Sequence, residues 1–253
     1  SIRGRNWHLP ASTVKLDEKY VALNGFKLLR DEQSLTLDGI LSDKFSDTLN
    51  VQMQNFDLSL LDLLMSEPLG ISGTMTGNGR AFGLLGDKYG LLPSLDGKDI
   101  RIDDEQFGDF SIRSRWNDEQ QRFNLSVKNS LGNTSPLDIR GHYYPSTKKL
   151  DAELDFDKFK IDFIEPLADG LISDVHGAVS GGIALEGPTD ELKISSEKCR
   201  FDDFAFKLDF TQVPYTLNGP FSVSEKGVIF NDIDIADSFG GHGTVNGGVS
   251  YDH

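Results

Sequence analysis

The stretch Leu150-Asp151-Ala152-Glu153-Leu154-Asp155-Phe156 places an apolar side chain at every second position and an acidic one between them. Successive side chains of a β-strand point to opposite faces, so this alternation predicts a strand with one apolar and one acidic face. Further along the chain, Ile233 stands between Asp232 and Asp234 in the same manner. Strand periodicity therefore dominates the sequence.

Turn-forming residues divide these alternating runs, as at Glu186-Gly187-Pro188 and Asn218-Gly219-Pro220. Two segments fit a helix instead, Leu58 to Met65 and Ile161 to Ala168, and Pro166 limits the second to about one turn. The sequence predicts an all-β fold with at most one or two short helices.

The composition excludes several classes of protein. Of 253 residues, 25 are basic and 40 are acidic, giving a net charge of −15, which disfavours nucleic acid as a direct partner. Hydrophobic residues make up 38%, too many for a wholly disordered chain, yet no run reaches the roughly 18 apolar residues of a membrane span. The start at Ser1-Ile2-Arg3 is no signal peptide, so we expect a segment of a longer protein.

Internal repetition is the most informative feature of the sequence. A set of three glycines recurs 104 positions later with the same spacing: Gly73, Gly77 and Gly83, then Gly177, Gly181 and Gly187. Glycines also end predicted strands at Gly39, Gly141 and Gly247. We interpret residues 1–20 as an irregular start, 21–122 and 123–227 as two β units, and 228–253 as the start of a third, all within one continuous sheet.

Both units change the phase of their alternation at the same place. The apolar phase runs to Met53 and resumes at Phe56 in the first unit, and it runs to Phe156 and resumes at Phe159 in the second. One extra residue moves every later side chain to the other face, so the slip predicts a β-bulge in both copies.

The order of these elements, ending in Gly177-Ala178-Val179-Ser180-Gly181 and Gly187-Pro188, resembles the repetitive periplasmic body of the TamB-like proteins. These belong to the AsmA-like superfamily of Gram-negative envelope proteins, and the resemblance covers most of Val21 to Tyr251. It implies an elongated, curved antiparallel sheet, folded like a taco around an apolar groove. It also implies a periplasmic location within a longer chain anchored in the inner membrane.

The resemblance further implies phospholipid transport between the inner and outer membranes, or support of outer-membrane protein assembly beside a TamA-type barrel. It transfers no catalytic residue and no cofactor. The partners we expect are phospholipid acyl chains, and the bare edges of an open sheet predict end-to-end association of separate copies.

An apolar face of this kind offers the candidate functional residues, chosen from the alternation. The candidate groove-lining residues are Leu49, Val51, Met53, Leu150, Leu154, Phe156, Phe159, Ile161, Phe204, Phe206, Leu208, Phe210, Phe230, Ile233 and Ile235. The same face could instead fill the closed core of a sandwich. A second hypothesis is a secreted or surface module that binds glycans or partner proteins through a platform of Trp7, Trp116, Tyr143, Tyr144 and Tyr215.

Catalytic and metal chemistry finds little support in the sequence. The histidines are scattered, at His8, His142, His176, His242 and His253, and a single cysteine, Cys199, cannot begin a zinc cluster. Acidic groups such as Asp202-Asp203 and the row Asp232, Asp234 and Asp237 are better read as solvated strand faces than as a carboxylate pair. We expect no enzyme, no metal and no cofactor.

Overall fold

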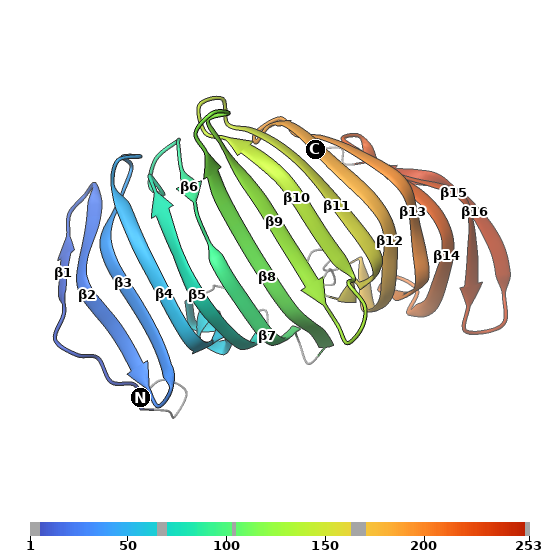
Figure 1. The fold of residues 1–253 in the computed structure, drawn as a ribbon. Helices are drawn as coiled ribbons and strands as arrows, with labels where there is room; N and C mark the ends of the chain where they lie inside the picture. The colour runs from blue at the N-terminus through green and yellow to red at the C-terminus, as the bar shows by residue number, and fades with distance from the viewer. Residues whose placement is uncertain (1–5, 65–69, 103–104, 163–170, 251–253) are drawn as a thin grey trace. The chain divides into compact units, whose positions relative to one another are not determined.

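The computed structural model describes residues 6–64, 70–102, 105–162 and 171–250. Over these residues the chain is all-β, and its sixteen strands form one sheet in which hydrogen-bonded neighbours follow chain order (Figure 1). The strands are β1 (Thr13–Leu16), β2 (Tyr20–Arg30), β3 (Gln33–Ser42), β4 (Thr48–Asp57), β5 (Ser72–Phe82), β6 (Gly90–Leu91), β7 (Ser94–Ile102), β8 (Glu105–Asn117), β9 (Arg122–Ser130), β10 (Leu137–Tyr144), β11 (Lys149–Lys160), β12 (Ile172–Pro188), β13 (Lys193–Leu208), β14 (Val213–Ser224), β15 (Gly227–Asp237) and β16 (His242–Ser250). The short β6 pairs with β5, off the main path of the sheet.

One of the two expected helical segments forms. A 3₁₀ helix, η1 (Leu58–Leu64), follows β4, and it buries Leu58 and Leu60. The other segment, Ile161 to Ala168, lies outside the described residues beyond Asp162.

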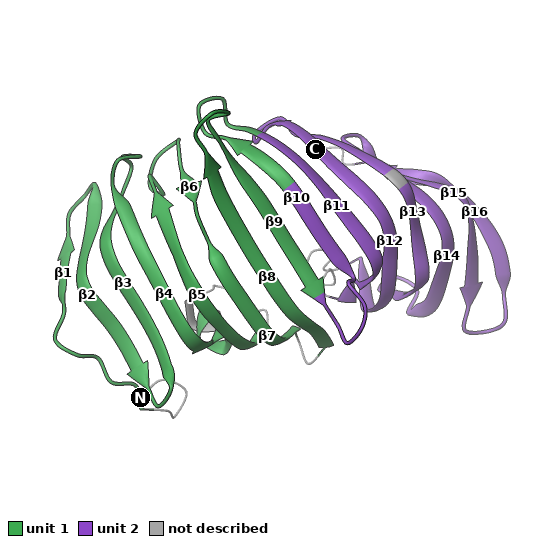
Figure 2. Cartoon of the chain, in the orientation of Figure 1, with its two compact units in different colours: residues 1–129, 141–149 green, residues 130–140, 150–253 purple. Residues whose placement is uncertain are grey.

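The chain divides into two compact units (Figure 2). Unit 1 comprises residues 1–129 and 141–149, and unit 2 comprises residues 130–140 and 150–253. Both units consist of strands that pair antiparallel with their neighbours, as β3 does with β4 in unit 1 and β13 with β14 in unit 2.

The predicted bulge is confirmed in the first copy by the register of β4 against β5. The pairing shifts between Met53 and Phe56, and Asn55 between them has a φ of 44°. At the corresponding position of the second copy, Lys158 has a φ of 53°. The bulge allows apolar side chains before and after it to stay on one face, which is why the sequence changes phase there.

The bulge belongs to an arrangement that occurs six times among the described residues. Each time, a residue with positive φ donates its backbone N–H to a side chain of the next strand, at 2.8–3.1 Å. The donor and acceptor pairs are Gly25 with Asp38, Asn55 with Thr76, Asp99 with Asp109, Lys158 with Ser180, Asp203 with Asn218, and Asp232 with Asn246. A bulge leaves an N–H outside the regular ladder, so each acceptor restores a bond that would otherwise be lost.

Five of these six acceptors directly precede a glycine of positive φ: Gly39, Gly77, Gly181, Gly219 and Gly247. Backbone conformation favours glycine at all five positions, and at Gly39, Gly77 and Gly181 lack of space requires it as well. A β-carbon at Gly77 would overlap the backbone oxygen of Ser94, and one at Gly181 would lie 2.6 Å from the Cα of Cys199. The recurring glycines of the sequence therefore mark places where the backbone turns sharply against the neighbouring strand.

Replacing Gly181 by alanine should destabilise unit 2. The residue has a φ of +125°, a region that costs a side chain about 1–3 kcal/mol, and the added carbon must also displace the backbone of β13. We expect the free energy of unfolding to fall by about 2 kcal/mol or more in chemical denaturation.

Gly243→Ala is the matched control, because a β-carbon there meets only the side chain of Ile235 at 3.6 Å and its φ lies outside the left-handed region. This variant should be neutral or slightly stabilising. Equal loss of stability in both variants would contradict the role assigned to the left-handed glycines.

Candidate functional site

One face of unit 2 is apolar and carries a continuous row of buried side chains. Its centre consists of Ile161, directly after β11, and of Val175, Phe204, Leu217 and Ile233 on β12, β13, β14 and β15. Ile233 is 0% exposed and Val175 is 1% exposed. The row forms because antiparallel pairing places these positions side by side on the same face.

Phenylalanine rings flank this row on β13, β14 and β15. The ring of Phe201 stacks on Phe204 at 4.8 Å and on Phe221 at 4.2 Å between centroids, and Phe204 stacks on Phe206 at 5.2 Å. Phe201, Phe206 and Phe221 are only half-buried. The apolar face of unit 2 thus has a buried centre and an aromatic surface that stays accessible.

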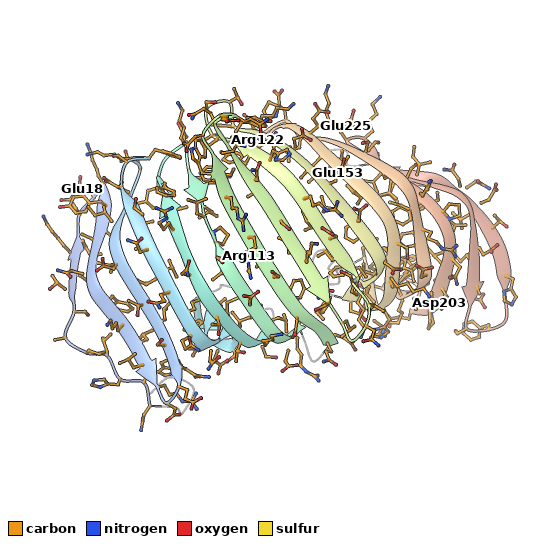
Figure 3. All side chains as sticks on the ribbon, in the orientation of Figure 1. Glu18, Arg113, Arg122, Glu153, Asp203 and Glu225 are labelled. Carbon is orange, nitrogen blue, oxygen red and sulfur yellow. The ribbon has the colours of Figure 1, made fainter. Side chains whose placement is uncertain are left out.

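The opposite face of unit 2 is acidic. On β11, Glu153 and Asp155 are exposed, and on the neighbouring elements Asp203 and Asp232 face solvent as well; Glu153 and Asp203 are labelled in Figure 3. The predicted separation of an apolar from an acidic face is confirmed. Its physical basis is that a carboxylate on the apolar face would lose its hydration without gaining a partner.

The candidate groove-lining residues fall into three groups by exposure. Five of them are buried: Leu49, Phe159, Ile161, Phe204 and Ile233. Nine are half-buried and keep accessible surface: Val51, Met53, Leu150, Leu154, Phe156, Phe206, Leu208, Phe230 and Ile235. The half-buried group is the one that a ligand could touch without displacing the core.

Phe210 is the exception among the candidates, and its assignment to the apolar face is corrected here. The strand β13 ends at Leu208, and Phe210 lies in the following turn with 97% of its surface exposed. The alternation Phe204, Phe206, Leu208 stops at this turn, whose position depends on the pairing of β13 with β14.

Two residues of the apolar face, Phe201 and Val175, could not be assigned to it from the alternation of the sequence. Phe201 belongs to it, but the bulge at Asp203 breaks the alternation between Phe201 and Phe204. Val175 stands between Asp174 and His176, which hides it among polar residues. The signal that could have revealed Phe201 is the same phase slip that marks the bulges at Asn55 and Lys158.

Unit 1 contains an aromatic cluster, which we define as Tyr89, Trp116, Phe123 and Tyr143. Tyr143 stacks on Tyr89 at 5.5 Å and on Phe123 at 6.5 Å, and Trp116 meets Phe123 edge-on at 4.8 Å. Phe123 is 2% exposed and Tyr143 is 7% exposed. Burial, and secondarily the neighbouring Tyr89, raises the pKa of Tyr143 above its ordinary value.

The segment before β7 covers this cluster. A β-carbon at Gly90 would overlap the ring of Phe123, so only glycine lets β6 approach it. Asp87 of the same segment lies 3.9 Å from the ammonium group of Lys148. The segment that follows β5 thus packs against the aromatic cluster.

The proposed aromatic platform is not assembled as an exposed surface. Tyr143 and Trp116 are packed in the aromatic cluster, and Trp7 packs against Phe56 with ring centroids 6.3 Å apart. Tyr144 accepts a hydrogen bond from Arg122, and Tyr215 packs against Phe206 in unit 2. The stacking surface that glycan binding through these five rings requires is therefore missing among them.

The side chains considered for catalysis have structural roles. Asp203 and Asp232 exchange hydrogen bonds with Asn218 and Asn246 at the bulges. Cys199 is buried, its thiol donates to the carbonyl of Gly182 at 3.3 Å, and burial raises its pKa. A high pKa and a buried position both disfavour a reactive thiolate.

The remaining polar candidates form no metal site in the described part of the chain. No group of three or more histidine, cysteine or carboxylate side chains is arranged there to hold a metal ion. His176 contacts Asp162 at 3.0 Å as an isolated pair, and His253 lies outside the described residues.

Comparisons with family models, with curated proteins and with solved structures found no match to this chain. Across the described residues, no helix combines the length and the apolar composition that crossing a bilayer requires. A functional proposal therefore depends on the side chains that the two faces of the sheet present.

Two aspartate substitutions on the apolar face should separate its buried centre from its accessible surface. Ile233→Asp buries an unpaired carboxylate and should lower the free energy of unfolding by about 4 kcal/mol or more. Leu154→Asp, at a half-buried position of β11, should cost less than about 2 kcal/mol, because its carboxylate can reach water.

Urea denaturation of both variants and the parent protein, followed by circular dichroism, measures the difference. If Leu154→Asp unfolded unit 2 as completely as Ile233→Asp, the apolar face would be a closed core instead of an accessible surface.

Proposed function

We propose that this chain is a non-enzymatic envelope segment whose apolar face contacts phospholipid acyl chains. The observation that carries the proposal is the split of the apolar face of unit 2 into a buried centre and half-buried phenylalanine rings. Apolar surface left accessible on one sheet face, with acidic residues on the other, suits a ligand that is itself apolar and elongated.

The proposal depends on the free-energy cost of leaving apolar side chains exposed to water. Each phenylalanine side chain that passes from water to an acyl chain gains about 1.5–3 kcal/mol when fully buried. The rings of Phe201, Phe206 and Phe221 would each gain part of this amount, because they are half-buried before any ligand arrives. An acyl chain needs no hydrogen bonds, so these phenylalanine rings lose no polar contact by receiving it.

The resemblance to the TamB-like proteins supports the same reading and extends it. Under that resemblance the segment lies in the periplasm, within a chain anchored in the inner membrane, and serves phospholipid transport or outer-membrane protein assembly beside a TamA-type barrel. The glycan-binding module based on exposed aromatic rings is less favoured, because Tyr143 is 7% exposed and two of the other rings are packed with it or against Phe56.

A photo-crosslinking residue at position 154 tests the proposal. With phosphatidylethanolamine and phosphatidylglycerol vesicles present during expression or reconstitution, the residue at position 154 should crosslink to phospholipid. A second site at Phe206, on the same face, should crosslink too.

Position 155 is the matched control, since Asp155 lies next along β11 and its side chain is exposed on the acidic face. Lipid adducts at 154 and 206 but not at 155 would support acyl-chain contact by the apolar face. Equal adducts at 154 and 155, or none at 154 and 206, would contradict it.

A further inference from the structure

Unit 1 contains a hollow, lined mainly by polar side chains, that the lipid proposal does not use. We call it the polar hollow. Its volume is about 910 Å³, and it extends over β3, β4, β5, β7 and β8. Binding sites for small ligands commonly enclose about 300–1,000 Å³, so the polar hollow is large enough for an extended ligand.

The charges that line the polar hollow balance one another. Two of the charged groups are the guanidinium groups of Arg80 and Arg115, and the other two are the carboxylates of Asp38 and Asp118. A ligand placed there meets no excess of either sign, and the net charge of −15 disfavours a polyanion anywhere on the chain. The electrostatics of the polar hollow therefore favour an uncharged ligand that binds through hydrogen bonds.

Hydrogen-bonding capacity in the polar hollow is largely unused. The exposed carboxamides of Gln52 and Asn78 make no hydrogen bond with another described residue, and each combines donors with an acceptor. Asp38 accepts the backbone N–H of Gly25 at 3.0 Å and keeps further acceptor sites. A hydroxyl group both donates and accepts, so a ligand rich in hydroxyl groups can bond to carboxamides, carboxylates and guanidinium groups alike.

The strand pairing arranges four of the uncharged polar groups in a row across the strands. Gln52 on β4 is the partner of Thr36 on β3 and of Asn78 on β5, and Asn78 is in turn the partner of Ser94 on β7. Neighbouring strands are about 4.8 Å apart, close to the length of one sugar unit. Successive sugar units of an extended chain can therefore meet successive members of the row.

Apolar groups adjoin the polar row at one end of the hollow. Leu92, Pro93 and the half-buried Trp116 belong to the same lining. The C–H groups of a sugar ring form an apolar surface, which can pack against such side chains while the hydroxyl groups reach polar ones. Of the five rings considered for the aromatic platform, Trp116 alone borders the polar hollow.

We infer that the polar hollow binds an uncharged oligosaccharide, laid across β4, β5 and β7, with its hydroxyl groups on Gln52, Asn78 and Ser94. The inference is independent of the lipid proposal, because it concerns unit 1 and side chains that acyl-chain contact does not require.

Isothermal titration of the whole 253-residue chain with cellohexaose, maltohexaose and chitohexaose tests the inference. We expect at least one of these uncharged hexasaccharides to bind with a dissociation constant of about 1 mM or tighter. Because no ion pair forms, this constant should change less than about twofold when sodium chloride is raised from about 0.05 M to about 0.5 M.

Gln52→Ala and Asn78→Ala should each weaken this binding about fivefold, which corresponds to the loss of one hydrogen bond. Both side chains are exposed, so the variants should keep the thermal unfolding of the parent protein. Gln106→Ala is the matched control, since it removes an exposed carboxamide from β8 that does not line the polar hollow. It should bind as the parent protein does.

Three results would each overturn the inference. They are no binding of any of the three hexasaccharides, unchanged binding by Gln52→Ala and Asn78→Ala, and tighter binding of the charged hexagalacturonate than of the uncharged sugars. Equal weakening by Gln106→Ala would place the sugar outside the polar hollow and would contradict the inference as well.

Discussion

The structure depends on one constraint: a β-bulge moves later side chains to the other face, and the chain must still keep its apolar residues together. At six of the bulges among the described residues, a residue with positive φ takes up the extra length and donates its N–H to a side chain of the next strand. Its N–H would remain unpaired without the side chain that the next strand provides. A bond of this kind contributes about 0.5–1.5 kcal/mol.

This constraint explains how the two faces come to differ. Because Phe201 and Phe204 lie on either side of a bulge, both contribute to the apolar face of unit 2, and their rings stack at 4.8 Å. The acidic residue of the bulge, Asp203, remains on the opposite face, where Asn218 binds it. The same separation keeps these apolar side chains together on one face, where we propose that acyl chains make contact. Function as proposed therefore follows from where the bulges occur.

Much of this could be predicted from the sequence, because strand periodicity and phase slips are local. The all-β fold, the short helix after Asp57, the bulge at Asn55 and the acidic face of β11 all follow from residues close together in the chain. Asn218 and Asn246 could not be identified as bulge partners, because they lie 14 or 15 residues away from the N–H groups that they bind. Phe210 was misplaced for a related reason, since only pairing between strands determines where β13 ends.

The features of the candidate site could likewise be predicted only in part. Alternation identified which residues share the apolar face, but not which of them are buried, because burial depends on neighbours two strands away. The rows of polar groups in unit 1, such as Gln52 beside Asn78, likewise appear only once the register is known.

Amide hydrogen exchange at Asp203 tests the central claim most directly. Its N–H donates to Asn218 at 2.8 Å, so it should exchange slowly although it lies outside the regular ladder. In Asn218→Ala this amide should exchange much faster, while the amides of Ala205 and Phe206 on the same strand stay protected. Fast exchange at Asp203 in the unmodified protein, or no change in the variant, would contradict the account.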